Sequence, residues 1–595
     1  MEHRHMHIQR TVGAVLTGAA LLVCAACSQD LNVTNPNSPD VARALASASD
    51  VQNLAVSSVH AWYIGATQVD PWVMLNVTGD LMTMNYGNFA ARFNNVEPRI
   101  AYNNNTASGD EEAANDPWVS QYGTIGDANN VLLAVSKGLA MPGGTAKYAQ
   151  LAQFTQAGAY MELALVFDKA FLVDETFDAS KGLPPFAPYD SVAAFAKKKI
   201  DALIAATSGE SYTYTSAEFP VSVNPPVNVT DPRGVFGNSG PIGGGFSSQV
   251  MYALANTWGA QLLAYTPRTA AEAATVNWAQ VLAYTKKGIG QGSSAAGAPF
   301  DFAVVGDYNT WWTDFATYFN MPTWMMIDLK LVSQMAPNVP NVYTGLPATS
   351  DTNVYDAVWA PQAPYDARLG IDTKKVTSYV PNTDEQHDYV YTRQVQGSAS
   401  RGIYMQSPYN RVRMWDYSYD APSPQIGPAP MVMAAENDLL EAEALVRTGG
   451  DLNLAAQLVN TTRVGRGHLT PLTAATSTAS FLQAITYELE VECDATDGYG
   501  FFALRAMDQL QAGTLRHLPV PATELSTDNL PVYTYGGVGL PDMSVMATGG
   551  AMQQAAFNVK KYEAGPFRTL DLPNGSTIQL PSPHALGHAN GVTKN

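Results

Sequence analysis

Apolar residues recur every three to four positions along several long stretches of this chain, which is the spacing of amphipathic helices. In residues 147–171, Leu151, Phe154 and Tyr160 share one side with small Ala and Gly residues that allow neighbouring helices to approach closely. The spacing predicts helices over residues 38–65, 116–138, 147–171, 191–209, 247–266, 277–289, 433–450, 451–468 and 478–492. Short turns separate consecutive segments, so the helices form pairs that bury their apolar faces by stacking on other pairs.

Across residues 290–430 the helical spacing fades, and Pro, Gly, Asn and aromatic residues dominate. The pattern therefore predicts a mainly α fold with helical repeats over residues 41–289 and 431–510, separated by a long loop-rich insert. The recurring helix–turn–helix unit favours a right-handed array of the tetratricopeptide type. A plain helical bundle is the alternative.

The composition of the chain limits the kinds of partner that it is expected to bind. The chain has 595 residues, of which 46% are hydrophobic, and its formal net charge is −19. An acidic surface argues against nucleic acid as a partner and against docking on anionic lipid headgroups, so no nucleic-acid partner is expected. Two of the three cysteines lie at the end of the first apolar run, so neither a disulfide framework nor a cysteine metal site is expected.

The first residues have the pattern of an export signal. Two arginines precede an uncharged apolar run over residues 11–26, which is shorter than the roughly 20 residues that span a membrane. The run ends in CAAC, so Cys27 resembles the acylated cysteine of a lipobox, although Cys24 stands where that motif prefers Leu. We expect residues 1–26 to be removed and Cys27 to carry the lipid. A plain secretory signal cut at the same place is the alternative.

Residues 27–40 are polar and rich in turn formers, which suits a tether between a lipid anchor and a folded body. No later stretch approaches 18 uncharged apolar residues. We therefore expect a protein that is anchored to a membrane rather than one that spans it.

Four segments, in order along the chain, resemble motifs of the SusD/RagB family of outer-membrane nutrient-binding lipoproteins. They are LNVTNPNSP (31–39), WVSQYGTIGDANNVLLAV (118–135), AENDLLEAEALVRTGGDLNLAAQLVNTTRVGRG (435–467) and RHLPVPATELSTDNLP (516–531). No single segment is specific, and the resemblance is carried by their order and spacing across residues 27–535.

The chain departs from the family pattern in two places. Residues 487–510 keep Glu488 and Arg505 but place Asp- and Gly-rich residues at 493–500 between them, and residues 536–595 extend beyond the last motif. The expected organisation is a signal peptide (1–26), a lipidated tether (27–40), a SusD-like domain (41–535) and a C-terminal extension without an assigned role (536–595).

The resemblance implies a lipid-anchored protein of the outer membrane, exposed on the cell surface, that binds an oligomeric nutrient. A glycan is the expected ligand, and a SusC-like TonB-dependent transporter is the expected partner that receives it. One alternative is a peptide-binding member of the same family. Another is a helical-repeat scaffold that organises other surface proteins without transport.

An enzyme is not expected. Glu488, Glu490 and Glu492 lie close together, but a glycosidase needs two carboxyls that face each other across a cleft. Neighbours on one helix point the same way, and we expect Glu488 and Glu492 to lie on a solvated face. His584 and His588 are four residues apart but lack the glutamate of a zinc-protease motif, so no metal site is expected there.

Two segments gather acidic side chains, residues 109–117 and 494–500. Neither matches an EF-hand loop, and we expect both to be solvated loops. No cofactor is expected; a calcium ion held by one of these loops is the alternative.

Aromatic rings beside polar side chains suit sugar binding, because rings stack on the apolar faces of sugars while amides and carboxylates bind the hydroxyls. Two stretches have this character, residues 68–93 and 308–324, and the resemblance implies ligand contacts in both regions. The candidate ligand-binding residues are Trp72, Tyr86, Phe89, Tyr308, Trp311, Trp312 and Trp324. For any single aromatic residue, core packing is the alternative, and Trp118, Tyr122 and Trp258 are assigned to the core because they lie on apolar helical stripes.

Overall fold

The computed structural model describes the greater part of the chain. The described ranges are residues 45–67, 69–84, 95–224, 246–291, 299–307, 311, 324–345, 352–372, 387–395, 402–413, 426–494 and 499–546, together with the backbone of 559–560, 567–571 and 577–581.

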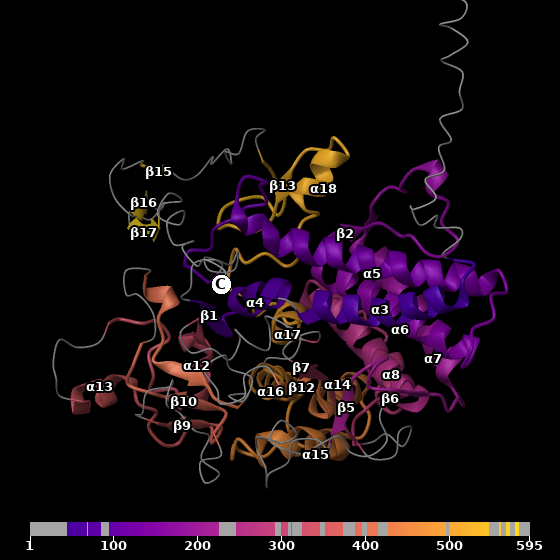
Figure 1. Ribbon diagram of the computed structural model, residues 1–595. Coiled ribbons are helices and arrows are strands. Elements are labelled where there is room, and N and C mark those ends of the chain that lie inside the picture. Colours follow the sequence, from indigo (N-terminus) through magenta and orange to yellow (C-terminus); the bar gives the residue numbers. More distant parts are fainter. Residues whose placement is uncertain are drawn as a thin grey trace, which may run out of the picture.

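Helices dominate these ranges, so the mainly α prediction is confirmed (Figure 1). The α-helices are α3 (Ala48–Thr67), α4 (Val69–Thr78), α5 (Glu112–Ser136), α6 (Thr145–Val166), α7 (Tyr189–Thr207), α8 (Ser248–Tyr265), α9 (Ala270–Ala273), α10 (Trp278–Thr285), α12 (Leu329–Met335), α13 (Thr352–Trp359), α14 (Ala434–Thr448), α15 (Leu452–Arg463), α16 (Thr478–Val491), α17 (Tyr499–Ala506) and α18 (Ala522–Thr527). Short 3-10 turns are η2 (Gly109–Glu111), η3 (Ala179–Lys181) and η7 (Ile403–Met405).

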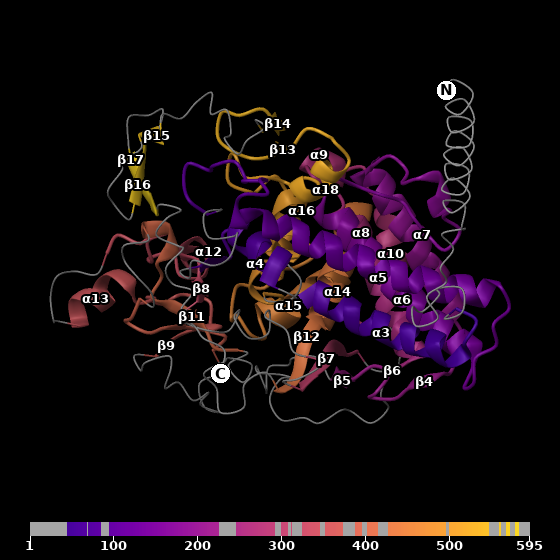
Figure 2. The ribbon, with the colours of Figure 1, turned by 45° about the horizontal axis from the view of Figure 1, so that its top comes forward.

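The long helices form one continuous array. Helix α5 packs on α3 and α6, α6 on α7, α7 on α8, and α8 on α10. The chain then leaves for the insert and returns at α14, which packs on α10 and continues the array through α15 and α16. Figure 2 shows α14 and α15 beside the earlier helices rather than in a separate body. Helix pairs that stack on neighbouring pairs in this way are the tetratricopeptide-like arrangement expected from the spacing.

Local sequence defines the helix ends. The hydroxyl of Ser247 accepts a hydrogen bond from the backbone N–H of Val250 at the start of α8. Helix α14 ends at Gly449, whose φ of +67° is the left-handed conformation that glycine adopts without steric cost. Two residues later the carboxylate of Asp451 caps α15. This Gly-Gly-Asp turn therefore reverses the chain between two antiparallel helices.

The strands in the described ranges are short, and β7 to β12 belong to the insert. They are β1 (Met82–Met84), β2 (Lys169–Ala170), β3 (Ala187–Pro188), β4 (Thr213–Tyr214), β5 (Val221–Asn224), β6 (Phe246–Ser247), β7 (Asp301–Asp307), β8 (Met325–Ile327), β9 (Leu369–Ile371), β10 (Tyr389–Tyr391), β11 (Tyr409–Arg411), β12 (Ile426–Val432), β13 (Tyr533–Thr534), β14 (Ser544–Val545), β15 (Val559–Lys560), β16 (Phe567–Asp571) and β17 (Thr577–Pro581). Two three-stranded sheets have the orders β12-β7-β5 and β11-β10-β9, and β15-β16-β17 pair among themselves.

The sheet β12-β7-β5 marks the borders of the insert. Strand β7 runs antiparallel to both neighbours, so the first and last strands of the insert are hydrogen-bonded to each other. The remainder of the insert, with α12, α13 and the β11-β10-β9 sheet, lies on one side of the helical array in both views (Figures 1 and 2).

Close approach of α3, α6 and α8 depends on one glycine. Trp62, Phe154 and Trp258 pack together here, with ring centroids 4.6 to 5.7 Å apart. A Cβ atom added to Gly158 would lie 2.5 Å from Nε1 of Trp62 and 3.2 Å from the Trp258 ring. The prediction that small residues permit close packing in this helix is confirmed.

The three aromatic residues assigned to the core lie there. Trp118 and Trp258 are buried, and Tyr122 packs against the same core while its hydroxyl donates to the carbonyl of Phe171 at 3.0 Å. Among the described residues, no helix is both long and apolar enough to cross a membrane.

Gly158→Ala should lower the free energy of unfolding by about 1–3 kcal/mol, because overpacking against the two tryptophans outweighs the ~1 kcal/mol that alanine gains in a helix. Gly123→Ala in α5 is the matched control, since a Cβ there meets nothing within 4 Å. Urea unfolding followed by circular dichroism should show the control to be as stable as the wild type or more so. Equal stability of both variants would contradict the packing argument.

Candidate functional site

The two aromatic stretches singled out in the sequence are joined by a two-stranded antiparallel ladder. Strand β1 pairs with β8, and Met84, the last residue of β1, lies opposite Met325, the first residue of β8. Paired strands lie about 5 Å apart. Residues 85–94, which follow β1, and residues 312–323, which precede β8, are therefore connected to the fold at the same end of one ladder.

A cluster of charged side chains lies at the opposite end of this ladder. Lys330 contacts the carboxylate of Asp80 at 2.9 Å and also pairs with Glu97, while Arg99 pairs with Asp80. Burial and the nearby charge of Asp80 raise the pKa of the Asp328 carboxyl above its usual range. These pairs hold Asp80, which precedes β1, against Lys330, which follows β8, and tie both to Glu97 and Arg99.

Three of the candidate ligand-binding residues lie in the described ranges. Trp72 is buried and its indole N–H donates to the carbonyl of Ala66. Trp311 is 9% exposed and packs edge-on against His60, with ring centroids 4.9 Å apart. Both rings therefore lie in the core. Core packing is the alternative expected from the sequence for any single aromatic residue. Trp324 is half-buried at the start of β8 and packs against the same core.

The other candidates lie outside the described residues. They are Tyr86, Phe89, Tyr308 and Trp312, together with Cys27 at the proposed lipidation site and the His584–His588 pair. Their roles stay predictions from the sequence.

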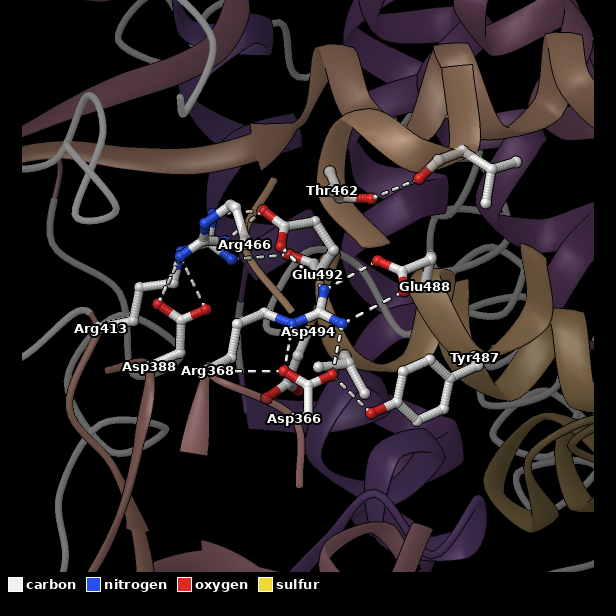
Figure 3. A network of polar contacts seen from close by, with 12 residues as sticks. Asp366, Arg368, Asp388, Arg413, Thr462, Arg466, Tyr487, Glu488, Glu492 and Asp494 are labelled. Carbon is white, nitrogen blue, oxygen red and sulfur yellow. Dashed lines mark hydrogen bonds and ion pairs between the residues drawn. The ribbon is translucent and has the colours of Figure 1, made fainter. Parts of the chain in front are cut away.

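The carboxylates on α16 form a buried network with arginines of the insert (Figure 3). Glu488 and Glu492 share a helix face as predicted, because both accept hydrogen bonds from Arg368, at 2.8 and 3.1 Å. Asp366 binds the other edge of the same guanidinium at 2.7 and 3.0 Å. The prediction that this face is solvated is wrong, since both glutamates and Asp366 are fully buried.

Glu492 is the centre of the network. Its carboxylate contacts Arg368, Arg413 and Arg466, and its backbone carbonyl accepts a further bond from Arg413 at 2.7 Å. Burial by itself raises the pKa of this carboxyl, but the three arginines outweigh burial and lower it. The residue follows the last turn of α16, where the helix dipole disfavours a negative charge by only ~0.3–1 kcal/mol. The arginine contacts decide its ionisation.

Two further pairs extend the network to the edge of the insert sheet. Asp388, just before β10, accepts two hydrogen bonds from Arg466 at 2.7 and 2.8 Å. Asp494 pairs with Arg411 of β11 and accepts from the hydroxyl of Tyr389 at 2.9 Å. Asp494 is buried, so the prediction of a solvated loop is wrong for this residue.

This arrangement holds the glutamates in ion pairs. Glu488 and Glu492 have no exposed surface, and each of them is hydrogen-bonded to guanidinium groups. Glycosidase carboxyls must instead face a bound sugar across an open cleft. The pair therefore has a structural role in this network.

The other acidic segment is helical. Residues 109–117 form η2 and the first turns of α5, so the prediction of a solvated loop is wrong here too. Glu111 is buried and accepts hydrogen bonds from the N–H and hydroxyl of Thr523, at 3.0 and 2.6 Å. Within the described ranges, no group of three or more His, Cys, Asp or Glu side chains is arranged to hold a metal ion.

The arginines of the network were not found from the sequence. One signal was present: in the segment YNRVRMW, Arg411 and Arg413 are two residues apart, and alternate residues of a strand point to one face. Both side chains do point inward, to Asp494 and Glu492. Nothing comparable marks Asp366 or Arg368, which pair with each other and whose further partners, Tyr487 and Glu488, are more than a hundred residues away.

The fold of this chain is similar to that of several solved structures. A SusD superfamily protein from Parabacteroides distasonis aligns with a TM-score of 0.54 and 12% identity, over 83% of this chain and 100% of its own. Two SusD superfamily proteins from Bacteroides vulgatus align with a TM-score of 0.50 and 13% identity, over 81% and 83% of this chain and 97% and 99% of theirs. No protein-family model matches the sequence, and no curated protein matches it.

The array and insert thus define a protein of the mainly α, tetratricopeptide-like class. Because the alignments span nearly the whole of the solved chains, this chain shares the fold of these SusD superfamily proteins. The resemblance noted in four sequence segments and the structural likeness point to the same fold.

Arg466→Gln should lower the free energy of unfolding by about 3–5 kcal/mol, because it leaves Asp388 buried without its bidentate partner and removes one arginine from Glu492. Arg516→Gln is the matched control: Arg516 pairs with Asp508 at 3.2 Å, but its side chain is 48% exposed. Removing an exposed pair should cost less than about 1 kcal/mol. Urea unfolding of both variants tests the difference, and similar losses would contradict a central role for the network.

Glu490 makes stability depend on pH in the opposite direction to Glu492. It lies on the other side of α16, and burial raises its pKa to about 8. A raised carboxyl pKa stabilises the native state below the unfolded value of ~4.3, and this contribution is lost as the pH rises toward 8. Glu490→Gln should remove a fall in stability of up to about 1.4 kcal/mol per pH unit across this window. Urea unfolding at pH 5, 6, 7 and 8 measures it, and parallel curves for variant and wild type would contradict the assignment.

Proposed function

We propose that this protein is a lipid-anchored binding protein of the outer-membrane surface that captures an oligomeric nutrient and delivers it to a SusC-like TonB-dependent transporter. A glycan is the proposed ligand. Capture and transfer require no bond to be made or broken, so the proposed activity is binding without catalysis.

The observation that carries this proposal is the SusD superfamily fold, which spans four-fifths of the chain. Fold alone does not define function, because one fold serves many functions. Two features of the sequence add support. Cys27 follows an apolar export signal in a lipobox-like context, and the four motif segments resemble nutrient-binding lipoproteins in their order.

The proposed ligand site is the end of the β1–β8 ladder. Residues 85–94 carry Tyr86 and Phe89, and residues 312–323 include Trp312. Because both segments are attached at paired residues Met84 and Met325, the ladder provides a common base for aromatic and polar groups that are more than 200 residues apart in sequence. Trp72 and Trp311 are assigned here to the core that supports this base.

Trp312→Ala should weaken binding of an oligosaccharide about tenfold, since aromatic anchors contribute most to such interfaces. Isothermal titration of the purified protein with malto-, cello-, xylo- and manno-oligosaccharides would identify the sugar that binds the wild type. Phe177→Ala is the control, because Phe177 is exposed at a loop distant in sequence from both segments. Trp311→Ala should instead lower thermal stability, because its ring lies in the core.

Titration with peptides as well as sugars separates the alternatives. Binding of casein-derived peptides in place of every sugar would favour a peptide ligand. Binding of neither class, together with a failure to co-purify with a TonB-dependent transporter from native membranes, would contradict the proposal and favour a scaffold.

A further inference from the structure

One buried amide connects three segments that are distant in sequence. Asn95 is 1% exposed and is the first described residue after 85–94. Its side-chain nitrogen donates to the carbonyl of Tyr404 at 2.7 Å, to the carboxylate of Asp328 at 3.0 Å and to the hydroxyl of Thr83 at 3.2 Å. Thr83 lies in β1, Asp328 directly follows β8, and Tyr404 lies in η7.

The chemistry of the partners fixes the orientation of this amide. The carbonyl of Tyr404 can only accept a hydrogen bond, so it requires the amide nitrogen of Asn95 whatever the protonation state of Asp328. The hydroxyl proton of Thr83 is used on the same Tyr404 carbonyl, at 2.6 Å, so the Thr83 oxygen is free to accept from Asn95. The Tyr404 contact therefore requires the nitrogen of Asn95, whose two hydrogens serve the three acceptors with one hydrogen shared, and an isosteric side chain without an N–H group cannot replace it.

The hydrogen bonds of Asn95 connect both strands of the β1–β8 ladder. Asn95 and Thr83 flank residues 85–94 on both sides, whereas Asp328 anchors the far end of β8, the strand that residues 312–323 enter. The backbone N–H of Asp328 also donates to the carbonyl of Leu81 at 3.1 Å, just before β1. The side chain thus holds β1, the C-terminal end of β8 and η7 in one arrangement.

We propose that Asn95 is a positioning residue that fixes β1, the C-terminal end of β8 and η7 relative to one another, through its bonds to Thr83, Asp328 and Tyr404. That this positioning serves ligand capture rests on the function proposed above. The positioning itself is a property of the unliganded protein and can be measured without any ligand.

Amide hydrogen exchange of the full chain, read by mass spectrometry, tests this directly. Asn95→Leu keeps the shape of the side chain but removes the donor, so exchange in β1, β8 and η7 should become about tenfold faster in all three together. Asn104→Leu is the matched control: Asn104 is equally buried, and its amide donates to the carbonyls of Val520 and Tyr533 at 2.9 Å. The control should accelerate exchange near β13 and leave the three segments unchanged.

A conservative variant separates positioning from general destabilisation. Thr83→Ser keeps the hydroxyl that accepts from Asn95 and should exchange as the wild type does. Faster exchange of one segment only, or equal acceleration throughout the chain, would overturn the proposal. If an oligosaccharide binds the wild type, Asn95→Leu should weaken its binding about tenfold while the control should not; if none binds, the function proposed above fails while the exchange result still decides the role of Asn95.

Discussion

The contact between Glu492 and three buried arginines is the constraint on which the rest of the structure depends. Arg368 and Arg413 belong to the insert, Glu492 and Arg466 belong to the helical array, and none of the four is exposed beyond a few per cent. Removing charges from water costs several kcal/mol for each ion, which is recovered only when every partner is present in good geometry. The insert can therefore dock on α16 in one position only, because any displacement separates buried charges in a medium of low dielectric constant.

That single docked position decides where the ladder lies. Arg411, the last residue of β11, lies two residues before Arg413 of the network. It pairs with Asp494 and approaches the sulfur of Met82 in β1 at 3.8 Å. Strand β11 also packs on β8. A rigid scaffold that positions variable surface segments is a common arrangement for binding proteins. Here a charge pair ties β11 to Asp494, and the amide of Asn95 bonds to Thr83 in β1 and to Asp328 after β8.

The sequence predicted the helices far better than the network. Helices such as α8 and α16 have apolar faces with a period near 3.6 and defined N-caps, so their existence follows from local pattern and their observed ends lie within two residues of the prediction. Glu488 and Glu492 were correctly placed on one face but wrongly given to solvent, because acidic residues are exposed unless paired, and two of their arginine partners, Arg368 and Arg413, come from the distant insert. Trp72 and Trp311 show a second limit. The local sequence around an aromatic residue with polar neighbours is the same whether the ring is buried or exposed, so it does not tell a core residue from a ligand-binding one. Contacts between residues that are distant in sequence do not follow from the pattern of any short segment.

The packing of α10 against α14 has a consequence for how such proteins can diversify. These helices are separated by more than a hundred residues of insert, yet they are direct neighbours, so the two ends of the insert leave the array about one interhelical distance, 8–10 Å, apart. A segment whose ends are that close can be lengthened, shortened or exchanged between relatives without moving any helix. What such an exchange must preserve is small: a strand pair at the border and the arginines that meet α16. The insert can therefore differ in length and sequence between related proteins as long as the border strand pair and the arginine contacts to α16 are kept.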